Sequence, residues 1–185
     1  MSNTIRILGI AGSLRKESFN RGALRAAQEL APEGVEIEIF DLDGIPGFNQ
    51  DQEREPPAIV AEFKKKIREA DAIIFSTPEY NYSIPGVLKN AIDWASRPYG
   101  DSAWDGKPAA IMGASGGNIA TARAQYDLRK SMVFLNMFPI NKPEVMIGGA
   151  GDKFDAEGNL TDETTRDFIR QQVEALVEWT RRLSK

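Results

Sequence analysis

The chain has 185 residues, a formal net charge of −4, and neither cysteine nor histidine. This length is most simply one domain with a single packed core. The missing side chains exclude disulfides, thiolate nucleophiles, Cys/His metal sites and every mechanism that needs an imidazole, so we expect catalysis to be carboxylate-based or supplied by a cofactor, with no metal bound.

The first part of the chain alternates between strand and helix patterns. The run Ile5–Ala11 is apolar and β-branched, which predicts a strand buried on both faces. Apolar residues then recur at helical spacing, with Ser18 or Asn20 as the candidate N-cap. Val35–Phe40 alternates at period two, as expected for an edge strand, and 43–57 has the composition of a loop.

The next helix is predicted to start at Pro57 and carries the basic run Lys64–Lys66. We expect these lysines to form a solvated face. With a net negative charge and no other basic run, nucleic acid is not the expected partner. No apolar run approaches the roughly 20 residues needed to cross a bilayer, and Met1–Arg6 lacks an export signal, so a cytoplasmic protein without membrane contact is expected.

The second part continues the alternation. Strands are expected at Ala72–Ser76, Pro108–Ala114 and Val145–Ile147. Helices are expected from about Gly86 to Ser96, from the turn at 115–118 to about Asn136, and from Thr161-Asp162-Glu163 onward, the last with Phe168, Ile169, Val173, Leu176, Val177 and Leu183 inward. Five strands alternating with helices predict an α/β fold: one flavodoxin-like domain over residues 1–185, a three-layer sandwich with a five-stranded parallel sheet of order 2-1-3-4-5.

The turn after the first strand suits a phosphate group. It precedes a helix N-terminus, where free N–H groups and the helix dipole favour an anion. Its glycine spacing matches neither the dinucleotide fingerprint nor the P-loop, and it offers donors that can surround a monophosphate: Ser13, Arg15, Ser18 and Asn20. The plainer alternative is that these residues cap the helix and that Arg15 is a surface cation.

Two further turns follow buried strands. Pro78–Tyr82 is rich in tyrosine and proline, which suits a planar aromatic ligand. Ser115–Asn118 is a turn of small residues. Each of them could be only a packing or turn element, but all three turns are predicted to meet at the crevice where the strand order reverses. Main-chain N–H groups of 79–82 and 115–117 are candidate contacts to the polar edge of a bound ring.

These motifs resemble a known family. Gly12–Arg15 with Ser18 and Asn20, and Pro78–Ser83 leading through Pro85 to Trp94, are similar to the NADPH-dependent FMN reductases. Within that family, the chain looks like the bacterial chromate and quinone reductases, also described as azoreductases. The resemblance covers nearly the whole chain, including Gln125-Tyr126 and Lys142–Glu144.

The resemblance implies bound FMN, with NADPH or NADH as co-substrate. The first turn would hold the FMN phosphate, Pro78–Tyr82 would border the isoalloxazine ring, and Ser115–Gly117 would meet its other edge. The implied FMN-binding residues are Ser13, Leu14, Arg15, Ser18, Phe19, Asn20, Pro78, Glu79, Tyr80, Asn81, Tyr82, Ser115, Gly116 and Gly117. No side chain is assigned a catalytic role, because the flavin itself carries the hydride.

The expected function is an FMN-dependent NAD(P)H oxidoreductase that reduces quinones, chromate, azo compounds or free flavin. The alternative is a flavodoxin-type electron carrier without direct NAD(P)H turnover. Such carriers tend to be strongly acidic, whereas 23 basic residues nearly balance 27 acidic ones here, which favours the enzyme. A third reading is a regulator that binds a nucleotide or sugar phosphate without redox chemistry.

Arg97 and Arg123 are candidate substrate-binding residues, because each lies just beyond a helix or turn that faces the crevice. The simpler reading of both is a surface salt bridge. The resemblance also implies a homodimer or homotetramer, with Arg123, Tyr126 and Glu144 as candidate interface residues.

Overall fold

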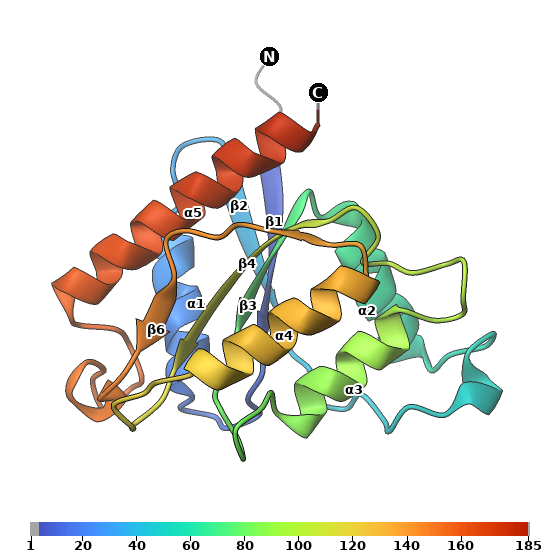
Figure 1. Ribbon diagram of the computed structural model, residues 1–185, viewed down its shortest axis with the longest axis horizontal. Helices are drawn as coiled ribbons and strands as arrows, with labels where there is room; N and C mark the ends of the chain where they lie inside the picture. Colours follow the sequence, from blue (N-terminus) through green and yellow to red (C-terminus); the bar gives the residue numbers. More distant parts are fainter. Residues whose placement is uncertain (1–3, 185) are drawn as a thin grey trace.

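The computed structural model describes residues 4–184 and shows a parallel sheet between two layers of helices (Figure 1). The strands are β1 (Ile5–Ala11), β2 (Val35–Phe40), β3 (Ala72–Ser76), β4 (Pro108–Ala114), β5 (Phe138–Pro139) and β6 (Val145–Ile147). The helices are α1 (Phe19–Glu29), α2 (Ala58–Glu69), α3 (Gly86–Ala95), α4 (Ala122–Phe134) and α5 (Glu163–Leu183). Two 3-10 turns, η1 (Gln50–Gln52) and η2 (Ala150–Asp152), lie in the loops.

The strand order β2-β1-β3-β4 is followed by a fifth position that β5 and β6 share, since both pair with β4. The expected parallel order 2-1-3-4-5 is therefore confirmed, and the fifth strand is split. Between its two pieces, the side chain of Gln172 in α5 donates to the oxygens of Ile111 and Pro143, both at 3.0 Å. The Gln172 side chain thus supplies the hydrogen bond that a continuous fifth strand would give to β4.

Successive side chains of the central strands point to opposite faces of the sheet, so that the molecule has two hydrophobic cores. Ile7 of β1 and Met112 of β4 face α1 and α5, whereas Leu8 and Ile111, their neighbours in sequence, face α2, α3 and α4. Strands β3 and β4 are buried along their whole length, as their continuous apolar character predicts. Among residues 4–184, no helix combines the length and apolar character needed to cross a bilayer.

Three expectations about helices need correction. Helix α4 begins only at Ala122, because Ala120 before it has a left-handed backbone (φ 56°). Phe168 is 48% exposed and Leu183 is also exposed, since neither lies on the buried stripe of α5. Lys64 is buried instead of solvated: its ammonium group donates to the oxygen of Arg97 and pairs with Asp101 at 3.2 Å.

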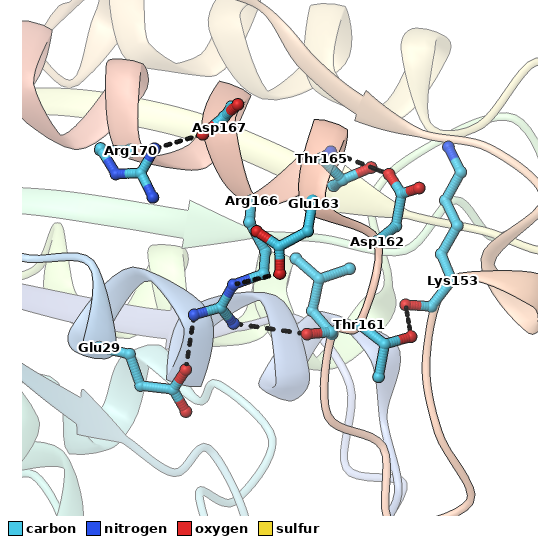
Figure 2. A network of polar contacts seen from close by, with 10 residues as sticks. Glu29, Lys153, Thr161, Asp162, Glu163, Thr165, Arg166, Asp167 and Arg170 are labelled. Carbon is cyan, nitrogen blue, oxygen red and sulfur yellow. Dashed lines mark hydrogen bonds and ion pairs between the residues drawn. The ribbon is translucent and has the colours of Figure 1, made fainter.

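Polar contacts fix the start of α5 against the rest of the molecule (Figure 2). The carboxylate of Asp162 accepts hydrogen bonds from the Thr165 N–H (2.8 Å) and hydroxyl (2.5 Å), which makes Asp162 the N-cap. Arg166 pairs with Glu29 of α1 at 3.0 Å and donates to the oxygen of Leu160 at 3.4 Å. The two helices that cover one face of the sheet are thereby joined.

Candidate functional site

The turns after β1, β3 and β4 lie together at the carboxyl edge of the sheet, the lower edge of the view in Figure 1. The ladder continues into these turns: Gly12 donates to the oxygen of Ser76 at 2.8 Å, and Thr77 donates to the oxygen of Met112 at 3.0 Å. Since β3 lies between β1 and β4, the predicted convergence of the three turns is confirmed.

Close approach of these turns depends on glycine. A Cβ atom at Gly113 would lie 2.2 Å from the oxygen of Thr77 and 2.3 Å from the hydroxyl of Thr121. A Cβ atom at Gly12 would lie 3.1 Å from the Thr77 hydroxyl and 3.3 Å from Pro78. Gly113 lies inside a buried strand, so its sequence context does not reveal that a larger residue is excluded there.

The first turn presents hydrogen-bond donors at the N-terminus of α1. Ser18 is the N-cap, and its hydroxyl oxygen accepts from the Asn20 N–H at 3.2 Å. The hydroxyl oxygen of Ser13 accepts from the Arg15 N–H at 3.3 Å. Both serines keep their own hydroxyl proton for another acceptor, and the exposed Arg15 forms no ion pair within residues 4–184. Hydroxyls, a guanidinium and a helix N-terminus together suit a phosphate.

Asn20, a candidate helix cap and phosphate ligand from its sequence position, has its side chain directed into the protein. Its side chain is buried, donates to the oxygen of Ala114 at 3.0 Å and accepts from the Ala114 N–H at 2.9 Å. Its amide oxygen also accepts from the hydroxyl of Ser76 at 3.1 Å. The interpretation of Asn20 as a helix cap was wrong, because the residue connects α1 to β3 and β4; its contact with FMN stays a prediction.

The second turn is a two-residue hairpin. Tyr80 and Ser83 exchange main-chain hydrogen bonds of 3.0 and 3.1 Å, and the residues between them, Asn81 and Tyr82, have positive φ angles of 52° and 70°. This is the geometry of a type I′ turn, which glycine and asparagine usually adopt. A tyrosine in the left-handed region is strained, and such strain is characteristic of functional sites.

The side chain of Glu79 points to α4. Its side chain is 6% exposed, one carboxylate oxygen accepts from the N–H groups of Arg123 (3.0 Å) and Ala124 (3.2 Å), and the other pairs with the Arg123 guanidinium. The same guanidinium lies 3.7 Å from the centroid of the Tyr82 ring. Both contacts join the second turn to the helix that follows the third.

A groove of about 460 Å³ lies between the second and third turns, within the usual size range of ligand pockets. It brings together six residues singled out from the sequence: Glu79, Asn81, Tyr82, Ser115, Gly117 and Arg123. Asn118, Ile119 and Ala120 also line it. The last two were missed, although their position directly after the Gly116-Gly117 turn was a usable signal. The first turn is not part of this lining and meets the site through Gly12 and Pro78.

Arg97 lies outside the groove. Its guanidinium stacks on Tyr99, 3.9 Å from the ring centroid, and faces the carboxylate of Glu53 at 3.9 Å. The predicted interface residues Tyr126 and Glu144 contact each other, because the tyrosine hydroxyl donates to the carboxylate at 3.1 Å.

Comparison with known proteins gives a consistent result. The family model described as NADPH-dependent FMN reductase matches residues 5–152. An NAD(P)H-dependent FMN reductase of Pseudomonas aeruginosa is 56% identical over 185 residues, with 99% of each chain covered. A quinone reductase of Pseudomonas putida is 45% identical over 182 residues, covering 98% of this chain and 97% of that one. The solved structure of FerB, a flavoenzyme NAD(P)H:(acceptor) oxidoreductase from Paracoccus denitrificans, superposes with a TM-score of 0.88 at 38% identity, covering 96% of this chain and 98% of that chain.

Proposed function

The chain belongs to the NADPH-dependent FMN reductase family, and from this premise we propose that it is an FMN-dependent NAD(P)H oxidoreductase that reduces quinones. The proposal treats residues 1–185 as one FMN-binding domain. The observation that carries it is the meeting of a phosphate-type turn with a groove bordered by a tyrosine hairpin. A ligand with one phosphate and a flat ring suits both parts.

The residues present suit FMN. Ser13, Arg15, Ser18 and the N-terminus of α1 would hold the phosphate, with Leu14, Phe19 and Asn20 beside it. The ring would lie between Pro78–Tyr82 and Ser115–Gly117. When bound, FMN supplies hydride acceptance and donation, chemistry that no side chain of this chain provides.

Main-chain donors of the second and third turns support this arrangement. The N–H groups of Asn81 and Tyr82, which line the groove, and of Gly116 in the third turn donate no hydrogen bond within residues 4–184. These groups therefore keep a donor for the polar edge of a ring, where reduction develops negative charge. A fixed donor at such a position acts in the manner of an oxyanion hole, with no reorganisation needed during the reaction.

Finer features of the proposal concern acceptors and assembly. Chromate, azo compounds and free flavin are proposed as further acceptors; the substrate-binding roles of Arg123, which lines the groove, and of Arg97 stay predictions. A homodimer or homotetramer is proposed, with Arg123, Tyr126 and Glu144 at the interface. Its support is the apolar face of α4, where Val133 and Phe134 are 82% and 77% exposed. A cytoplasmic location belongs to the same proposal.

The visible spectrum of the purified protein tests the proposal. We expect flavin absorbance at about 370 and 450 nm after addition of FMN and removal of the excess. Anaerobic NADPH or NADH should bleach the bound flavin, and a quinone should restore its colour. A flavin that stays oxidised would support the electron carrier instead, and a protein that retains no FMN would support the phosphate-binding regulator.

A further inference from the structure

The carboxylate of Glu79 is fully used by α4. It accepts from two N–H groups in the first turn of that helix, at 3.0 and 3.2 Å, and pairs with the Arg123 guanidinium. Glu79 itself belongs to the turn after β3, so the contact joins two segments that are far apart in sequence. With both oxygens occupied, Glu79 acts on the groove through the residues that it holds.

Arg123 contacts both Glu79 and the hairpin. Its guanidinium is positioned between the Glu79 carboxylate and the face of the Tyr82 ring, 3.7 Å from the ring centroid. A cation at this distance from an aromatic face is attracted to it. The Nε atom of Arg123 is buried, and within residues 4–184 it has no hydrogen-bond partner. The guanidinium thus has the Glu79 carboxylate on one side and, on the other, the Tyr82 ring, which belongs to a residue that is 70% exposed.

The hairpin requires support from outside itself. Asn81 and Tyr82 both have left-handed backbone angles, which asparagine tolerates but which strain a tyrosine, so that this conformation of Tyr82 persists only where the surroundings hold it. The two main-chain hydrogen bonds between Tyr80 and Ser83 close the turn without fixing its direction. The Ser83 hydroxyl also lowers the pKa of the Asp127 carboxyl in α4. Helix α4 thus contacts the second turn at Glu79 and at Tyr82.

We propose that Glu79 is a positioning residue for the flavin ring: by holding Arg123 against Tyr82, it fixes the strained Asn81–Tyr82 turn in the orientation that receives the ring. This inference rests on the proposed function. In it, the Glu79 side chain does not touch the ligand and acts through Arg123. It explains why a buried carboxylate and a guanidinium lie at the wall of the groove already paired with each other.

The test measures FMN affinity by quenching of flavin fluorescence. Glu79→Gln keeps the size of the side chain but loses the charge that holds Arg123, and we expect it to weaken FMN binding about tenfold. Glu29→Gln is the control for the loss of one charge, because it removes the same charge from another glutamate paired with an arginine, Arg166, on the opposite face of the sheet. The control is expected to bind FMN like the wild type.

A second set of variants separates positioning from general destabilisation. Arg123→Met keeps an apolar stem on Tyr82 without the charge, and the double variant with Glu79→Gln should bind FMN about as weakly as either single variant, because the two residues act as a unit. Tyr82→Phe keeps the ring and should bind FMN more tightly than Tyr82→Ala. Visible circular dichroism of bound FMN, which reports the setting of the ring, should change in Glu79→Gln and not in Glu29→Gln.

The outcomes are distinguishable. If the wild type binds no FMN, the proposed function falls and this inference falls with it. If the wild type binds FMN and Glu79→Gln binds it equally well, only the positioning role is overturned. Equal weakening in Glu29→Gln, or additive effects in the double variant, would also overturn it, since the cause would then be net charge or two independent contacts.

Discussion

The side chain of Asn20 pairs with the main chain of Ala114 in the way that a neighbouring strand would. Its amide donates to the Ala114 oxygen at 3.0 Å and accepts from the Ala114 N–H at 2.9 Å. Ala114 is the last residue of β4, where the third turn of the site begins. One side chain of α1 therefore fixes the distance between the phosphate-type turn and the groove.

Replacing Asn20 by alanine should lower the free energy of unfolding of the flavin-free protein by about 3 kcal/mol, because two buried main-chain groups lose their partners. Urea denaturation measures this. Asn141→Ala, at an exposed position, is the control and should change the free energy by less than about 0.5 kcal/mol. Similar values for the two variants would show that Asn20 is dispensable for the fold.

Gly113→Ala should separate the turns of the site. The added methyl group would lie 2.2 Å from the oxygen of Thr77, so β4 and the second turn must move apart. We expect a loss of about 2–3 kcal/mol in the free energy of unfolding and weaker FMN binding. Gly86→Ala is the control, since its methyl group would meet no atom within 4 Å. A stable Gly113→Ala protein with normal FMN affinity would contradict the close approach.

Two substitutions at Asn81 should differ in the size of their effect on stability. Glycine adopts a φ of 52° without strain, so Asn81→Gly should keep the wild-type free energy of unfolding within about 0.5 kcal/mol. Valine is β-branched, and Asn81→Val should lose about 1–2 kcal/mol. Thermal unfolding of the flavin-free proteins compares the two. Equal effects would mean that the left-handed turn does not persist in solution.

Acid should remove part of the stability that Asp162 provides. The Thr165 hydroxyl and N–H hold the pKa of the Asp162 carboxyl below its ordinary value of 3.8. Because the folded state lowers this pKa, the contribution is complete above pH 3.8 and is lost as the pH falls through that value and below the folded-state pKa. Asp162→Ala should therefore cost about 1 kcal/mol at pH 7, and less near pH 3. Urea denaturation across this range checks it, and a difference that stays constant down to pH 3 would refute it.

The sequence was a good guide to the sheet because period-two and continuous apolar patterns are local. The bounds of β1 to β4 followed from them residue by residue, and the strand order followed from the alternation of strands with helices. The features that the sequence did not predict depend on contacts between residues far apart in the chain. Strand β5 has only two residues, and Lys64 is buried because the loop after α3 folds over it.

For the site, too, the local features were predictable and the long-range contacts were not. Motifs predicted which turns meet, since the carboxyl ends of parallel strands share an edge. They did not predict that Glu79 would face α4, that Asn20 would bond to Ala114, or that Arg97 would lie outside the groove. Each of these depends on the direction of one side chain relative to an element far away in sequence.

The divided fifth position has a consequence for self-association. A long straight border of a sheet exposes a row of free N–H and C=O groups on which another chain can add as a strand. Here the border consists of pieces of two and three residues, and carbonyl groups between and beside them are already bonded to the side chains of Arg129, Gln172 and Gln125. The protein is therefore protected at this margin against fibrillar growth through strand addition.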